Sequence, residues 1–287
     1  MTELKTMEDD WRSGLRSSGS IKSCRCIQKV GVKIVPIGFF LVLSCGFITT
    51  YIIAVTNDDV RSVFPYISDT GNFHPESSLF TLVCTIGAIF AFLTFYIHYK
   101  HTKLMTEHKW YLRCNTLAFL LSLGTCFGLL LIASFQDGAT LSAIHYVGAV
   151  LMFGVGTIYC CITTCIGWHI ARIHSDHWLV VITGIRIGMC LLMVVGVIAV
   201  FTATFIADTK YENLSGNSTF DKFKWSPENE EFQVHMIATV SEWFVAFIAI
   251  LFFLTFVRSF HSIEVETITV KVKEQYGYLR IDERDFT

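Results

Sequence analysis

Residues 187–207 read IGMCLLMVVGVIAVFTATFIA, and this stretch decides the fold class of the chain. It holds no charged side chain. As a helix rising about 1.5 Å per residue, it is long enough to cross a hydrocarbon core roughly 30 Å thick. A backbone within lipid finds no water and must pair its own N–H and C=O groups, which a helix does. We therefore predict a transmembrane helix here.

Five similar apolar runs accompany it. They cover residues 34–55, 79–99, 115–135, 141–166 and 232–257. Hydrophobic residues make up 53% of the 287 residues and charged residues only 16%, which is typical of a membrane-embedded protein. We predict an all-α polytopic membrane protein, a six-transmembrane-helix bundle over residues 34–257. A disordered arm (1–33) precedes the bundle and a C-terminal tail (258–287) follows it.

Lys and Arg gather on one side of the predicted membrane. The two termini and the two loops on that side carry 18 of these residues, whereas the three loops on the other side carry 4. Cytosolic segments are enriched in Lys and Arg, so both termini are predicted to be cytosolic. The opposite side carries two N-glycosylation sequons, at Asn213 and Asn217, before the last predicted helix. That loop is therefore predicted to be lumenal.

The first lumenal loop has an ordered pattern at its centre, residues 64–71. Pro65 restricts the backbone, Asp69 can form an Asx-turn, and Gly71 can adopt a positive φ angle. We therefore expect this loop to be folded and held close to the second helix.

A polar residue inside an apolar helix is costly unless it is paired, and the clearest example is Glu242. It lies ten residues after Phe232, near the bilayer midplane, where a charged and unpaired carboxylate is costly. His235 lies two turns nearer the lumen on the same face. His145 lies near the lumenal end of the fourth helix, and the loop that carries Asp69 can fold over the lumenal end of the bundle. We predict one lumen-facing polar pocket from these four residues.

Three interpretations of this pocket are open. It is a hydrogen-bond network that fixes helix packing, a site for a ligand or lipid headgroup, or a catalytic or metal-binding site. The sequence has no HExxH pair, GxSxG elbow, P-loop or dinucleotide fingerprint, so we expect no metal, no cofactor and no catalytic residues. Nothing in it indicates nucleic-acid binding. Arg186, just before the fifth apolar run, is expected to extend to the cytosolic headgroups.

The predicted cytosolic segments carry candidate modification and sorting signals. Cys24 and Cys26 form a juxtamembrane pair among basic residues, a pattern typical of S-palmitoylation. In the tail, Tyr276 and Tyr278 are each followed at the third position by a bulky apolar residue, Leu279 and Ile281. Clathrin adaptors bind such tyrosine signals in lysosomal cargo, and they are the protein partners we expect, besides membrane lipids.

The loop motif carries a family resemblance. Pro65-Tyr66-Ile67-Ser68-Asp69-Thr70-Gly71, followed by Pro75-Glu76, resembles the first-loop signature of the damage-regulated autophagy modulator (DRAM) family. Matching positions elsewhere are Phe135-Gln136, His145, Arg186, Trp225, Pro227, His235 and Glu242-Trp243. The resemblance implies a six-helix protein of lysosomal and related membranes that modulates autophagy. More distant relatives act in GPI-anchor lipid remodelling and phosphoinositide regulation.

Three functional hypotheses follow. The first is a non-enzymatic multi-pass regulator of autophagy in lysosomal or endosomal membranes, with the Golgi and the plasma membrane as alternative locations. The second is a lipid-handling protein, acting in GPI- or phosphoinositide-related remodelling or in lipid transport. The third is a channel or proton-linked carrier that uses His235 and Glu242.

Overall fold

The computed structural model describes residues 31–136, 142–215, 223–225, 227–228, 232–261 and 263. Within these residues, six helical spans are long and apolar enough to cross a membrane, which confirms the predicted fold class. The helices are α3 (Ile34–Thr56), α4 (Glu76–Met105), α5 (Lys109–Ser134), α6 (Ser142–Ala149), α7 (Gly156–His174), α8 (His177–Ser215), α9 (Phe232–Leu254) and α10 (Phe256–Phe260). A π-helical segment, η3 (Val150–Val155), joins α6 to α7 in the fourth span.

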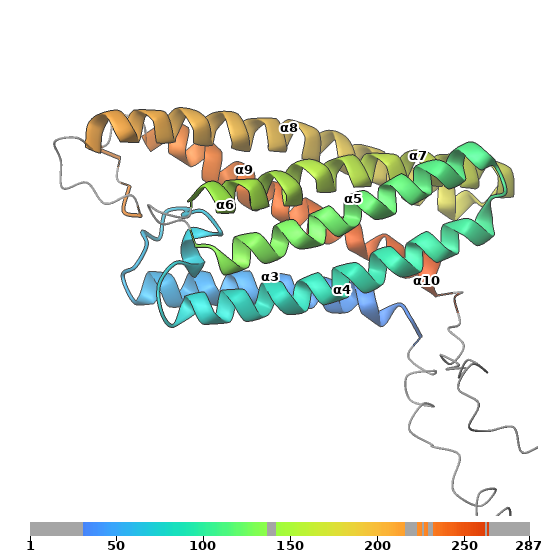
Figure 1. Ribbon diagram of the computed structural model, residues 1–287, viewed down its shortest axis with the longest axis horizontal. Helices are drawn as coiled ribbons and strands as arrows, with labels where there is room; N and C mark the ends of the chain where they lie inside the picture. Colours follow the sequence, from blue (N-terminus) through green and yellow to red (C-terminus); the bar gives the residue numbers. More distant parts are fainter. Residues whose placement is uncertain are drawn as a thin grey trace, which may run out of the picture.

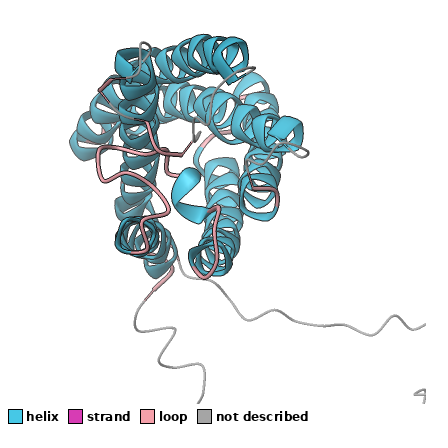
Figure 2. Cartoon of the chain, turned by 90° about the vertical axis from the view of Figure 1, so that its left-hand side faces the viewer, coloured by secondary structure: helices cyan, strands magenta, loops and turns pink. Residues whose placement is uncertain are grey.

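The helices form a closed ring. Each span packs against the next in sequence, and α9 returns to pack against α3 (Figures 1 and 2). The start of α3 and the end of α10 lie at one end of the ring, with the α4–α5 and α7–α8 turns (Figure 1). We call this the termini end, and the opposite end, with the α3–α4 and α8–α9 connections, the loop end. The charge distribution predicts that the termini end is cytosolic.

The helices extend past the predicted apolar runs at the termini end. α4 continues to Met105 and α8 begins at His177. Charged residues end an apolar run, but they do not end a helix that emerges into the headgroup region. Only two residues separate α7 from α8, and Asp176 caps α8 because its Oδ1 accepts the N–H groups of Trp178 and Leu179 at 2.9 and 3.3 Å.

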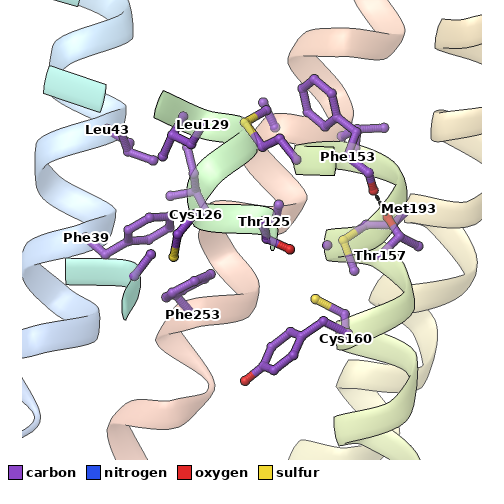
Figure 3. Close-up of a pocket in the computed structure, with 18 of the residues that line it drawn as sticks. Phe39, Leu43, Thr125, Cys126, Leu129, Phe153, Thr157, Cys160, Met193 and Phe253 are labelled. Carbon is purple, nitrogen blue, oxygen red and sulfur yellow. Dashed lines mark hydrogen bonds between the residues drawn. The ribbon is translucent and has the colours of Figure 1, made fainter. Parts of the chain in front are cut away.

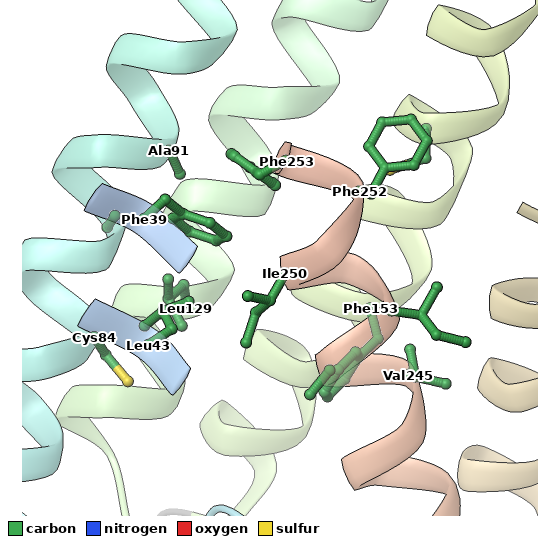
Figure 4. Packing of buried hydrophobic residues seen from close by; sticks show 14 of the residues in the cluster. Phe39, Leu43, Cys84, Ala91, Leu129, Phe153, Val245, Ile250, Phe252 and Phe253 are labelled. Atoms are coloured by element: carbon green, nitrogen blue, oxygen red, sulfur yellow. The ribbon is translucent and has the colours of Figure 1, made fainter. Parts of the chain in front are cut away.

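Aromatic and aliphatic side chains fill the interior of the ring. Phe39 of α3 stacks on Phe253 of α9 with 3.8 Å between ring centroids (Figure 4). Phe252 and Phe256 are fully buried. The outer surface is also apolar, since Phe205 is 72% exposed. This combination suits a bundle that is surrounded by lipid.

Two glycines allow α5 and α6 to touch backbone to backbone. A Cβ built on Gly128 would lie 2.7 Å from the Gly148 carbonyl oxygen, and one on Gly148 would lie 3.0 Å from the Gly128 oxygen. Helices in lipid associate largely through such close packing. Gly124, the other member of the GxxxG step in α5, has its nearest neighbours at 4.0 Å.

We expect Gly128→Ala to lower the thermal stability of the purified protein, because its methyl group would collide with the backbone of the facing helix. Overpacking of this kind costs about 1–3 kcal/mol. The measurement is the apparent unfolding midpoint in detergent at a constant scan rate. Gly124→Ala is the matched control, because the space beside it is open. Equal midpoints for the two variants would contradict the close crossing.

Candidate functional site

The loop between α3 and α4 folds into the mouth of the helix ring. Its centre forms a short 3-10 turn, η2 (Asp69–Gly71), and Ile67, Asp69 and Thr70 are all at most 4% exposed. Viewed from the loop end, the loops cross the opening of the ring (Figure 2). This location agrees with the expectation of an ordered loop held close to the second helix.

Glu242 of α9 holds the centre of this loop. Its Oε2 accepts the backbone N–H of Ile67 at 2.8 Å, and the side chain is buried. A buried carboxylate and a buried backbone N–H are each costly when unpaired, so the bond satisfies two groups at once. The two residues lie 175 positions apart in the chain.

Further hydrogen bonds join the same loop to three helices. The Trp243 indole N–H donates to the Pro65 carbonyl oxygen at 2.8 Å, again from α9. Tyr66 Oη lies 3.1 Å from Thr204 Oγ1 of α8. On the other side, Thr50 Oγ1 of α3 lies 3.1 Å from Thr70 Oγ1. The loop therefore bridges the first span and the last two spans.

Gly71 is required for close packing and not for the backbone conformation that the sequence suggested. It lies within the 3-10 turn, and the prediction of a positive φ angle is wrong. A Cβ at this position would come within 2.5 Å of the Phe80 ring in α4. The constraint is close packing of the loop on α4. Asp69, in the same turn, accepts a weak bond from the Asn72 side chain at 3.4 Å.

His145 lies opposite Glu242 across two small cavities. Its Nδ1–H donates to the Phe135 carbonyl oxygen at 2.8 Å, which fixes the end of α5. His145 and Glu242 both line a cavity of about 30 Å³ and a second of about 50 Å³ that Tyr66 also lines. Asp69 lines neither of these two cavities.

His235 lies near these cavities and packs among aromatic side chains. Its ring stacks on Trp225 at 4.6 Å between centroids and meets the edge of Tyr66 at 5.2 Å. Tyr66 is therefore the residue that connects His235 to the Glu242–His145 cavity. Among the described residues, no three His, Cys, Asp or Glu side chains gather closely enough to hold a metal ion.

Of the four predicted pocket residues, His145, His235 and Glu242 thus lie around one folded loop, and Asp69 lies within that loop. Sequence reasoning marked Tyr66 and Trp243 only as family positions, without their roles as connector and loop anchor, and it missed the loop anchors Thr50 and Thr204. Threonine is common in transmembrane helices, so no local pattern marked Thr50 and Thr204.

Several predicted sites lie outside the described residues. These are Cys24, Cys26, Asn217, Tyr276, Tyr278, Leu279 and Ile281. The backbone of Asn213 belongs to the last turn of α8.

An apolar cavity of about 80 Å³ lies deeper in the ring, between the loop end and the termini end. Figure 3 shows its walls, with Phe39 and Phe253 on one side and Met193 on another. Thr157 also lines it, but its hydroxyl donates to the Phe153 carbonyl oxygen at 2.7 Å in the π-helical segment. The cavity is therefore an apolar space that separates the polar groups of the two ends.

Arg186 occupies a position that the sequence did not predict. The side chain was expected to extend to the headgroups, but it is only 2% exposed, so that prediction is wrong. Its Nε donates to Thr255 Oγ1 at 2.8 Å, and its guanidinium lies 4.5 Å from the centroid of the Phe256 ring. The start of α8 packs against the end of α9, and this packing draws the side chain inward.

Glu242→Ala is expected to loosen the loop, because it leaves the buried Ile67 N–H unpaired at a cost of about 1–3 kcal/mol. Arg61 in the loop is exposed, but trypsin cleaves only where the backbone can open locally, so cleavage after Arg61 would speed up by about tenfold or more. Glu242→Gln keeps an acceptor oxygen and should change cleavage much less. The measurement is the cleavage rate after Arg61 in purified protein, followed by mass spectrometry.

Asp58→Asn is the surface control for this experiment. Asp58 forms an exposed ion pair with Lys224 at 3.2 Å, which contributes little to stability. If Glu242→Ala is cleaved at the rate of Asp58→Asn, the carboxylate does not hold the loop.

Comparisons with known proteins agree with this architecture. The model of the Frag1/DRAM/Sfk1/Cwh43P N-terminal domain family matches residues 31–263. The DNA damage-regulated autophagy modulator protein 2 of Bos taurus is 32% identical over 239 residues, 82% of this chain and 86% of that protein. No solved structure matches the chain significantly.

Two further relatives extend the comparison. The DNA damage-regulated autophagy modulator protein 1 of Homo sapiens is 29% identical over 247 residues, 83% of this chain and 95% of that protein. Transmembrane protein 150A of Xenopus laevis is 23% identical over 204 residues, 71% of this chain and 64% of that protein. The family match covers all six spans and the loop between α3 and α4, and the chain is a member of the DRAM family of membrane proteins.

Proposed function

We propose that this protein modulates autophagy from lysosomal or endosomal membranes and that it does so without catalysing a reaction. The observation that carries the proposal is the family match over residues 31–263, together with relatives named as autophagy modulators. The relatives' names support the process, and the six apolar spans support a role within a membrane.

The contacts of the polar residues support a non-enzymatic role. Glu242 accepts the Ile67 N–H, and His145 donates to the Phe135 carbonyl oxygen, so each binds a backbone group. A general acid or base must instead reach a proton on a substrate. The cavities between them, of about 30 and 50 Å³, have room for a few waters at most. We infer that the site keeps the loop docked and that loop docking sets the activity.

The experiment that tests this proposal is rescue of autophagic flux in cells that lack the protein, with co-imaged lysosomal markers. Rescue should fall in the order wild type, Glu242→Gln, Glu242→Ala, because a neutral acceptor binds an N–H more weakly than a carboxylate does and alanine does not bind it. Asp58→Asn should rescue like wild type. Only cells in which the variant reaches the lysosome are compared, which separates function from folding.

Other outcomes would change the assignment. Full rescue by Glu242→Ala at the lysosome would show that loop docking does not set activity. A normal flux after deletion, together with a changed lipid profile, would favour the lipid-handling alternative. Retention of Glu242→Gln in the endoplasmic reticulum would make the residue purely structural.

The tail signals are proposed to direct sorting through clathrin adaptors. Replacing both Tyr276 and Tyr278 with alanine is expected to move the protein toward the cell surface, because adaptors require the tyrosine side chain. The measurement is surface biotinylation at equal expression. An unchanged surface fraction would show that the tyrosines play no part in sorting.

A further inference from the structure

A polar cavity of about 310 Å³ lies at the termini end of the bundle. It is several times larger than the apolar central cavity and the two cavities beside Glu242. Its walls come from the last turns of α4 and α7, the start of α8 and the region of α10. A water molecule needs only about 15 Å³ of such space, so the cavity can hold a polar group with its hydration.

Five residues of the described lining of this cavity are basic side chains or imidazoles. They are His98, His101, Arg186, Arg258 and His261. The only carboxylate among the described lining residues is Asp176, and its Oδ1 is engaged in capping α8. Even with all three histidines neutral, the lining carries two positive charges and one negative charge. The cavity therefore favours an anion.

Arg186 is the buried charge of this cavity and is incompletely paired. Nε donates to Thr255 and the guanidinium face lies over Phe256, but Nη2 is buried without a hydrogen-bond partner among the described residues. Stacking on a ring satisfies the face of a guanidinium and leaves its N–H groups unbound. Gly167 of α7 leaves space beside Nη1, because a Cβ there would lie 3.6 Å from it. A buried cation with free donors is costly unless an acceptor binds it.

The exposed tryptophan beside the cavity indicates that the cavity lies near the level of the membrane surface. Trp178, which lines it, is 60% exposed, and Leu104 at the end of α4 is 86% exposed. Tryptophan is enriched at the boundary between lipid and water. Lipid phosphate groups lie at this boundary, and the guanidinium fork matches phosphate geometry.

We propose that this cavity binds a phosphate group, with Arg186 as its main ligand and the exposed Arg258 as a second cation. The group belongs either to an anionic lipid headgroup or to free phosphate. This inference goes beyond the proposed function in autophagy and does not depend on it.

The test uses the full-length protein purified in detergent and in phosphatidylcholine nanodiscs with or without phosphatidate, a lipid with a terminal phosphate. Native mass spectrometry measures retained lipid, and calorimetry measures binding of inorganic phosphate. We expect Arg186→Met to weaken binding by about 10- to 100-fold, as expected for lost hydrogen bonds to a charged group. Arg186→Lys should recover part of the affinity, because the charge remains and the fork is lost. Arg258→Gln should weaken binding by a few-fold.

Matched controls separate specific binding from general attraction. Arg61→Gln removes an exposed cation at the opposite end and should leave binding unchanged. Gly167→Leu should block the space beside Arg186 without changing any charge, whereas Gly167→Ala should be tolerated. If Arg186→Met does not fold, Gly167→Leu and Arg258→Gln still test the site.

The two probes identify the source of the phosphate. Retention of phosphatidate without calorimetric binding of inorganic phosphate assigns the site to a lipid headgroup, and binding of both assigns it to phosphate in general. The proposal is overturned if neither probe binds, if Arg186→Met binds like wild type, or if Arg61→Gln weakens binding as much as Arg186→Met does.

Discussion

The hydrogen bond from the Ile67 N–H to Glu242 Oε2 is the constraint on which the loop end of the bundle depends. A carboxylate placed inside a membrane helix needs a partner, and so does the backbone of a loop that enters the ring. Each group satisfies the other. Because the loop centre is held at this depth, Tyr66, Pro65 and Thr70 reach their partners on three helices. A loop held in this way closes the mouth of the ring.

The termini end also buries a charged side chain, here the positively charged Arg186. Arg186 is drawn inward by Thr255 and the Phe256 ring, and the apolar cavity lined by Phe39 and Met193 separates it from Glu242. Neither charge faces the lipid. The two side chains differ in what they leave unbound, because Glu242 meets a backbone donor, whereas Arg186 keeps a buried nitrogen without a partner among the described residues. That difference is why we describe Glu242 as part of a closure and Arg186 as part of a binding cavity.

The candidate site was partly predictable from sequence. Glu242 and His145 could be predicted as site residues because polar side chains are costly inside apolar runs. The structure places both at the same cavities. The partner of Glu242 could not be predicted, because a backbone N–H has no sequence signature. Gly71 was expected at a turn for its φ angle, and the actual reason is the Phe80 ring of another helix. Arg186 was assigned to the headgroups because its distance from the helix end permits that, and only packing against α9 decides otherwise.

By itself, the sequence determined the fold class and the number of spans, since a long apolar run within a bilayer must form a helix. Its loop motif also indicated the family. It also indicated that the loop between α3 and α4 is ordered. The tertiary structure alone decided how far that loop enters the ring, which backbone group Glu242 binds, and which way Arg186 points. These outcomes depend on contacts between residues far apart in the chain, and helix periodicity carries no information about such contacts.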